Sequence, residues 1–217
     1  MKHYDFEQGT PEWLEARKGA ITGSKFKDAR DRLKNGNPSS KAILYAKDVA
    51  RERCGGTAEK VFQNAAMRIG SEQESFARSA YESRTGALVE PVGFFKTDDG
   101  MFGLSPDGLI DDDGVLEIKT MVSSDTLFTA VAEGDISAYQ DQCDGYLWLL
   151  GRKWVDLVLW APDMADLGLD MVIHRITRNE ERIEKLEADL MAFSLTVRTY
   201  ESALRKAAIA NKEKEAA

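Results

Sequence analysis

Apolar residues recur along this chain with two different periods, and the change between them separates predicted helices from predicted strands. In the first 86 residues the spacing is helical, and the chain offers Thr10 followed by Pro11 as one helix start and Ser40 as a cap for another. The predicted helices begin at Pro11 and cover residues 24–33, 41–53 and 71–83. Asn35-Gly36-Asn37-Pro38 and Gly55-Gly56 supply the stops.

Short apolar or alternating runs then replace the helical spacing. They predict strands over residues 87–95, 101–104, 108–110 and 115–122, with Asp-Gly turns between them. Further on the pattern predicts a helix over residues 137–150, strands over 154–160 and 171–176, and a long amphipathic helix from Asn179, with a charged tail from residue 211 that we expect to be frayed. Without repeats or linkers, this order predicts one α/β domain over residues 1–217, with a mixed central sheet flanked by helices and a long C-terminal helix.

Composition narrows the possible functions. The 217 residues are 43% hydrophobic, enough for a sizeable core, but no apolar run approaches the ~20 residues that span a bilayer. The first residues, Met-Lys-His-Tyr-Asp-Phe-Glu, lack the apolar stretch of a signal peptide, so we expect a cytoplasmic protein without a membrane partner. With only two cysteines and two histidines, any metal must be held by oxygens, which favours magnesium or manganese.

Charge is distributed unevenly. The formal net charge of −8 alone argues against a nucleic-acid partner. Residues 17–53, however, hold eleven basic and four acidic side chains, a net charge of +7, whereas residues 107–144 hold ten acids and one base. Such a chain can attract a polyanion at one face and concentrate cations at another, although solvated helix faces would give the same counts.

Two carboxylates and a lysine are predicted to meet at one hairpin. If residues 115–122 form a strand, Glu117 and Lys119 face one side and Ile118 the core, while the acidic turn at residues 111–114 folds the strand after Asp107 back beside Glu117. Carboxylates that hold a divalent cation, with a lysine nearby, suit hydrolysis of a phosphodiester. The alternative is an acidic, solubilising hairpin, and the turn acids themselves are interpreted as a turn only.

These residues resemble a known nuclease signature. The PD-(D/E)xK motif is similar to two segments of this chain, Pro106-Asp107 and Glu117-Ile118-Lys119, and the similarity implies a restriction-endonuclease-like core. Four further segments, in order, resemble motifs of the phage lambda exonuclease family, the alkaline exonucleases of viral recombination. They are residues 8–24 (Gln8-Gly9-Thr10-Pro11-Glu12-Trp13 to Gly23-Ser24), Gly70-Ser71-Glu72-Gln73-Glu74, Ser105-Pro106-Asp107-Gly108 and Ala138-Tyr139-Gln140-Asp141-Gln142. The resemblance covers roughly residues 8–160; Gly23 stands where the family pattern leads us to expect alanine.

The resemblance implies a role for each matching position. Asp107, Glu117 and the backbone carbonyl of Ile118 would hold Mg²⁺, with Mn²⁺ as a substitute and two ions per site. Glu74 would be a further ligand, direct or through water, unless it merely pairs with Arg78 one helical turn away. Lys119 would orient water or stabilise the transition state.

The same resemblance implies a pocket for a terminal phosphate. Arg17, Ser24, Ser105 and Gln142 would bind the 5′-phosphate of DNA, although either serine could be only a helix cap or turn residue. Met67 would act as a wedge that separates the strands, unless it is a core methionine.

In function, the resemblance implies an Mg²⁺-dependent 5′-to-3′ exonuclease on linear double-stranded DNA. It would release mononucleotides and leave 3′ overhangs for a single-strand annealing protein, as a homotrimeric ring encoded by a phage or prophage in a bacterial host. Two alternatives remain: a structure- or site-specific endonuclease on the same fold, and a non-catalytic DNA-end-binding module. The presence of Asp107, Glu117 and Lys119 together weakens the second.

Overall fold

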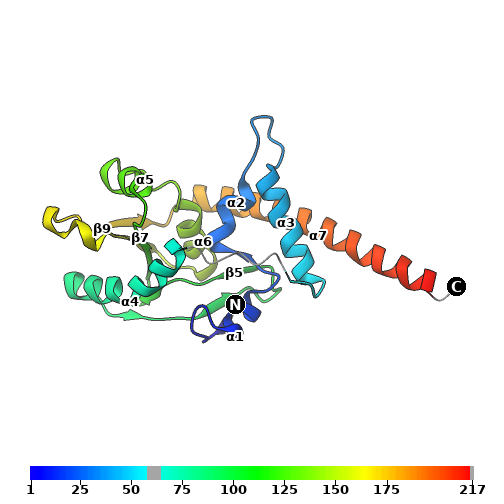
Figure 1. Cartoon of the computed structure of the whole chain (residues 1–217), viewed down its shortest axis with the longest axis horizontal. Helices are drawn as coiled ribbons and strands as arrows, with labels where there is room; N and C mark the ends of the chain where they lie inside the picture. The colour runs from blue at the N-terminus through cyan, green and yellow to red at the C-terminus, as the bar shows by residue number, and fades with distance from the viewer. Residues whose placement is uncertain (58–64, 216–217) are drawn as a thin grey trace.

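The computed structural model describes residues 1–57 and 65–215, which form two β-sheets with helices packed around them (Figure 1). The larger sheet has the order β3-β6-β7-β8-β9, and the smaller has the order β1-β4-β5-β2. The strands of the larger sheet are β3 (Val89–Glu90), β6 (Gly108–Ile110), β7 (Gly114–Thr120), β8 (Trp154–Trp160) and β9 (Met171–Thr177). Those of the smaller sheet are β1 (Lys2–Tyr4), β2 (Ile21–Thr22), β4 (Phe94–Lys96) and β5 (Phe102–Leu104).

The centre of the larger sheet is the parallel pair β7 and β8. Parallel neighbours need a long crossover, and the chain supplies it through α5 (Ser124–Leu127), a π-helical turn η2 (Phe128–Ala132) and α6 (Gln140–Leu150). All other pairs in this sheet are antiparallel, so the sheet is mixed as predicted. The sequence pattern had not indicated α5 or η2.

Both faces of the central strands are covered, in keeping with the largely apolar sequence of β8, which Asp156 alone interrupts. Val155, Leu157 and Leu159 enter the main core, which also contains residues of α2 (Phe26–Arg30), α3 (Ser40–Arg53), α6 and α7 (Glu180–Glu215). The alternate residues Val158 and Trp160 face a second core beneath α4 (Ala65–Thr85). Strand periodicity therefore separates the two layers, with α6 packed on one face of the sheet and α4 on the other.

Three predicted boundaries in the first half of the chain were wrong. The segment 24–33 is a short 3-10 turn η1 (Gly23–Lys25) followed by α2, and the chain after Arg30 is already extended. The cap of α3 is Ser39, whose hydroxyl accepts from the Ala42 N–H at 3.2 Å, because Ser40 is already helical. The run 87–95 is not one strand, since it splits into β3 and β4 in different sheets.

Other boundaries lie close to the predictions. Helix α1 (Pro11–Arg17) starts at the Thr10 cap, β6 and β8 have the predicted bounds, and α6 ends at Gly151 in a left-handed conformation. At the N-terminus, β1 pairs with β4 and His3 stacks on Phe95. A last 3-10 turn, η3 (Pro162–Leu167), joins β8 to β9.

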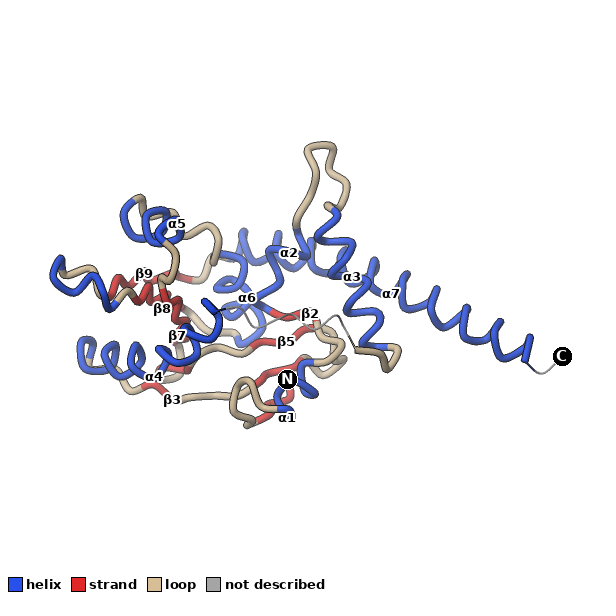
Figure 2. The backbone as a smooth tube through the Cα atoms, in the orientation of Figure 1, coloured by secondary structure: helices blue, strands red, loops and turns tan. Residues whose placement is uncertain are grey.

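Helix α7 packs along the core only with its first half. Its buried residues run from Ile183 to Val197 at helical spacing, whereas the side chains from residue 202 to 215 are exposed. Figure 2 shows these last turns extending away from the remainder of the molecule. The helix continues to Glu215, and the expected fraying from residue 211 stays a prediction. Within the residues that the structure describes, no helix combines the length and apolarity that crossing a bilayer requires.

Candidate active site

The hairpin of β6 and β7 brings Asp107 beside the strand that carries Glu117. Gly108 pairs with Leu116, and the Asp107 N–H donates to the Leu116 carbonyl at 3.1 Å. The Asp107 carboxylate in turn accepts from the Ile118 N–H at 2.6 Å. The Ile118 side chain is buried in the core under α4, while Glu117 points to the opposite face. This geometry confirms the predicted hairpin and the predicted division of faces.

Glu117 is a buried carboxylate held by three side chains. Its Oε1 accepts from Lys119 Nζ at 2.6 Å and from Gln142 Nε2 at 2.7 Å, and its Oε2 accepts from the Tyr146 hydroxyl at 2.5 Å. Only 2% of Glu117 is exposed. A carboxylate this deeply buried needs such donors, because an unpaired buried charge is strongly unfavourable.

Glu74 reaches this region from α4. Its carboxylate lies 3.6 Å from the Arg78 guanidinium, which also donates to the Asp107 carbonyl at 3.3 Å. The pair with Arg78 anticipated from the sequence therefore exists, and it attaches α4 to the turn that bears Asp107. Burial raises the pKa of Glu74, the charge of Arg78 opposes that rise and the charge of Glu117 adds to it.

The electrostatics of the cluster favour the arrival of a cation. Burial, followed by the charges of Glu117 and Glu74, raises the pKa of Asp107 well above its usual range. Burial lowers the pKa of Lys119, but the charges of Glu117 and Asp107 outweigh it and raise that pKa, so the ammonium stays charged. The carboxylates of Asp107, Glu117 and Glu74 therefore lie close together with few positive charges nearby, and a divalent ion would relieve the repulsion between them.

The oxygen ligands of this site suit a hard ion such as Mg²⁺, and water or substrate would supply the remainder of its coordination shell. Carboxylate and carbonyl oxygens are the ligands that Mg²⁺ takes in proteins, and Mg²⁺ commonly keeps several waters. In the described part of the chain, no three His, Cys, Asp or Glu side chains are close enough to form a ready-made metal site. The residues therefore fit a site in which Asp107 and Glu117 contribute and waters or substrate oxygens complete the coordination.

A small cavity of about 150 Å³ joins the carboxylates to the predicted phosphate residues. Its lining combines residues that lie far apart in the sequence: Gln8, Trp13, Arg17, Gly23, Ser24, Phe94, Ser105, Asp107, Glu117, Lys119, Gln142 and Tyr146. All four predicted phosphate residues are among them, together with Asp107, Glu117 and Lys119. Glu74 is not part of this lining, so it lies at the edge of the site.

Arg17 is placed to receive an anion. Its guanidinium stacks 4.0 Å from the centre of the Trp13 ring, and burial lowers its pKa. Among the described residues it has no ion pair with a carboxylate within 4 Å. Trp13 also donates to Ser105 Oγ at 3.0 Å, which ties α1 to the turn before Asp107. The planar, unpaired fork can bind a phosphate in bidentate fashion.

The structure shows contacts of Gln142 and Gly23 that the sequence did not indicate. The Gln142 amide donates to Glu117 and to the Tyr146 hydroxyl, both at 2.7 Å, so in this structure it supports the carboxylate. A Cβ on Gly23 would lie 2.8 Å from the end of the Leu104 side chain. The glycine therefore allows the close packing of η1 on β5.

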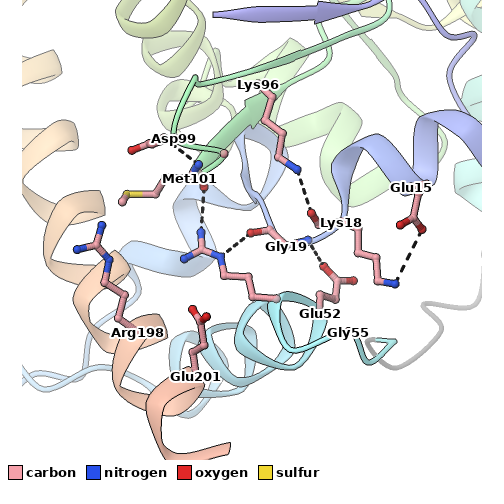
Figure 3. Close-up of a pocket in the computed structure, with 12 residues that line it drawn as sticks. Glu15, Lys18, Gly19, Glu52, Gly55, Lys96, Asp99, Met101, Arg198 and Glu201 are labelled. Carbon is pink, nitrogen blue, oxygen red and sulfur yellow. Dashed lines mark hydrogen bonds and ion pairs between the residues drawn. The ribbon is translucent and has the colours of Figure 1, made fainter. Parts of the chain in front are cut away.

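A second, larger cavity of about 700 Å³ lies beside the loop that follows α1, at Lys18 and Gly19 (Figure 3). Arg198 and Glu201 extend from α7 on one side of it, and Glu15 and Lys18 lie on the other. Its charged side chains hold the backbone of the loop. Arg53 donates to the carbonyls of Gly19 at 2.7 Å and Met101 at 3.4 Å, Glu52 accepts from the Gly19 N–H at 2.8 Å, and Lys96 donates to the Lys18 carbonyl at 3.0 Å.

Met67 lies in α4, but its side chain is outside the part of the chain that the structure describes, so the strand-separating role stays a prediction. Tyr146 was missed by the sequence reasoning, although it follows Gln142 by four residues and therefore shares a helix face with it. That spacing was the available signal.

Comparison with known proteins identifies the family of this chain. The YqaJ-like viral recombinase domain matches residues 12–153, a span that includes Arg17, both carboxylates of the hairpin, Lys119 and Gln142. The chain belongs to the YqaJ-like viral recombinase family. The predicted resemblance to lambda-type exonucleases is thereby confirmed, and no curated protein matches the chain.

Solved structures resemble this YqaJ-like chain over most of its length. An alkaline exonuclease (LHK-Exo) from Laribacter hongkongensis is 32% identical, with a TM-score of 0.79 over 92% of this chain and 98% of that one. The same exonuclease in complex with dAMP gives a TM-score of 0.80. A phage-related exonuclease from Haemophilus somnus 129PT shares the fold at 17% identity, with a TM-score of 0.65 over 86% of this chain and 96% of that one. The fold is that of the PD-(D/E)xK nucleases, as predicted, and the family supports a nuclease role in recombination.

Proposed function

We propose that this chain is an Mg²⁺-dependent 5′-to-3′ exonuclease that acts on linear double-stranded DNA. The observation that carries the proposal is the single cavity in which Arg17, a free phosphate-binding fork, lies with Asp107, Glu117 and Lys119. A terminal phosphate held at one end of such a cavity would present the adjoining phosphodiester to the carboxylates at the other. The 32% identical alkaline exonuclease was solved with dAMP, a nucleoside monophosphate of the kind that this reaction would release.

The metal would be held by the Asp107 and Glu117 carboxylates and the Ile118 carbonyl, with Glu74 as a further ligand at the edge, and we expect two ions per site. When bound, a divalent ion supplies a water of lowered pKa and neutralises charge on the phosphate. Mn²⁺ should substitute, because it accepts the same oxygen ligands.

The protein residues would position the reacting groups. Lys119 keeps its positive charge beside Glu117 and can donate to the attacking water or to a phosphate oxygen, where charge develops in the transition state. Arg17, with Ser24 and Ser105, would bind the 5′-phosphate and so fix which bond reaches the carboxylates. Trp13, which stacks on Arg17, orients the guanidinium for that task.

The proposal extends to assembly. Three copies closed into a ring would place their basic segments, residues 17–53, around one channel, which would let a chain of net charge −8 retain DNA. The 3′ overhang left behind would be the substrate of a single-strand annealing protein, and Met67 would separate the strands at the entrance.

The test uses linear duplexes labelled at the 5′ end, at the 3′ end or internally. Labelled mononucleotide should appear first from the 5′ end, only with Mg²⁺ or Mn²⁺ present, and a covalently closed circle should stay intact. Early release of 3′ label would refute the direction. Nicking of the circle would instead indicate an endonuclease, and DNA-end binding without cleavage would indicate a non-catalytic module.

A further inference from the structure

Tyr146 connects three parts of the site through one hydroxyl group. The residue lies on α6 and is 1% exposed, with its ring in the main core. Its hydroxyl lies 2.5 Å from Glu117 Oε2 on β7, 2.7 Å from Gln142 Nε2 on its own helix, and 3.2 Å from the Ser105 carbonyl in the turn before Asp107. No family motif identified in the sequence includes this position.

The number of available protons fixes the direction of each hydrogen bond at the Tyr146 hydroxyl. A tyrosine hydroxyl has one proton to donate and can also accept. Because the Gln142 amide can only donate through Nε2, the hydroxyl accepts there, and its own proton is directed to the close Glu117 oxygen. Glu117 Oε1 is held by Lys119 and Gln142, whereas within the described residues Oε2 has Tyr146 as its donor. The hydroxyl therefore decides how the plane of this carboxylate is turned.

We propose that Tyr146 is a positioning residue that fixes the Glu117 carboxylate in the orientation needed to bind the divalent cation. This inference rests on the proposed metal-dependent function. Partners that hydrogen-bond to metal-ligating carboxylates orient them, and losing one typically costs about 10- to 100-fold in metal affinity or activity. The same hydroxyl oxygen lies 3.2 Å from the Ser105 carbonyl, so Tyr146 also packs against the turn that carries Asp107.

The chain contains a matched control for this role. Tyr81 is also 1% exposed, and its hydroxyl donates to a buried carboxylate, Asp156, at 2.6 Å. Asp156 is paired with Arg175 and lies on the face of β8 that is covered by α4. Neither Tyr81 nor Asp156 lines the small cavity. Removing either hydroxyl thus breaks the same kind of buried bond, but only one of the two bonds reaches the proposed metal ligands.

The experiment compares Tyr146→Phe with Tyr81→Phe, each of which keeps the ring and its packing. Binding of Mn²⁺ without DNA is measured by calorimetry, thermal unfolding is measured in EDTA, and digestion of linear duplex is followed across a range of Mg²⁺ concentrations. We expect Tyr146→Phe to weaken Mn²⁺ binding about 10- to 100-fold. The Mg²⁺ concentration for half-maximal rate should rise in parallel, and high Mg²⁺ should restore much of the rate. Tyr81→Phe should lower thermal stability while both metal measurements stay at wild-type values.

Three outcomes would overturn the inference. Wild-type Mn²⁺ affinity in folded Tyr146→Phe would show that the hydroxyl serves packing alone, and equal weakening by Tyr81→Phe would show a general stability effect. Gln142→Met, which removes the amide that donates to both Glu117 and Tyr146, provides a second variant if Tyr146→Phe does not fold; unchanged Mn²⁺ affinity there would also count against the inference. If the wild-type chain itself neither binds Mn²⁺ nor digests DNA, the proposed function fails instead.

Discussion

Replacing Asp107 by asparagine should stabilise the metal-free protein while abolishing its activity. Asparagine has nearly the same shape, and its carbonyl oxygen can still accept from the Ile118 N–H, the contact that Asp107 makes at 2.6 Å. The substitution removes the negative charge of the ionised Asp107 carboxylate. Burial and the neighbouring carboxylates of Glu117 and Glu74 raise the pKa of Asp107 well above its usual range, so its ionised form destabilises the folded state.

The expected size follows from that repulsion. Removing strain of this kind at a functional site commonly adds about 0.5–2 kcal/mol to the free energy of unfolding. In a chain of this length each kcal/mol shifts the melting temperature by about 2–4 °C, so the variant should melt roughly 1–8 °C higher in EDTA. Loss of a metal ligand removes several kcal/mol of transition-state stabilisation, and each ~1.4 kcal/mol is tenfold in rate. Digestion of linear duplex should therefore fall by about a hundredfold or more.

The difference between the two proteins should depend on pH in a defined direction. In the unfolded chain Asp107 ionises near pH ~4, whereas in the folded chain its raised pKa delays ionisation to higher pH. Between those two pKa values the folded state binds more protons, so wild-type stability falls as pH rises, and the asparagine variant lacks this loss. The gap in melting temperature should close below pH ~4 and be largest above the folded pKa.

Thermal unfolding of both proteins in EDTA from pH 4 to 8 measures this gap. Added Mg²⁺ should stabilise the wild type more than the variant and so narrow the gap. A variant that melts lower than the wild type in EDTA at pH 7 would refute the electrostatic argument. A gap that is the same at every pH would show that packing, not ionisation, causes the difference.

Three further predictions concern the residues around Asp107. Lys119→Met should lower kcat about 10²- to 10³-fold while Mn²⁺ binding persists, and a near-native rate would contradict the proposed hairpin site. Arg17→Ala should slow digestion of 5′-phosphorylated ends about 10- to 100-fold, because a charged hydrogen-bonded pair contributes ~1.5–3 kcal/mol. An equal loss of rate on 5′-hydroxyl ends would indicate that Arg17 serves general DNA binding. Arg53→Ala removes the hydrogen bonds to the Gly19 and Met101 carbonyls. This variant should raise KM for phosphorylated ends with little change in kcat. An unchanged KM would show that Arg53 does not help to position Arg17 through the loop after α1.

Local patterns in the sequence determined much of this structure. The alternation around Ile118 and the acidic turn before it predicted the hairpin that pairs Gly108 with Leu116, because side-chain direction in a strand repeats every two residues. The mostly apolar run 154–160 likewise predicted a strand, and β8 has those bounds. Arg17, Ser24, Ser105 and Gln142 were selected from motifs, and the structure places all four in one cavity with the hairpin carboxylates.

Contacts between distant segments decided the rest. Pro91 and Gly93 mark the break within residues 87–95. The assignment of the two pieces to different sheets depends on Val89 pairing with Ile110 and Phe94 pairing with Tyr4. The bond from Tyr146 to Glu117 spans 29 residues and the bond from Arg53 to Gly19 spans 34, so neither follows from periodicity. The raised pKa of Asp107 arises because folding gathers carboxylates from α4 and the hairpin in a space that excludes most water. Periodicity and turn chemistry could therefore name the reacting residues, but only tertiary packing determined their partners and their charges.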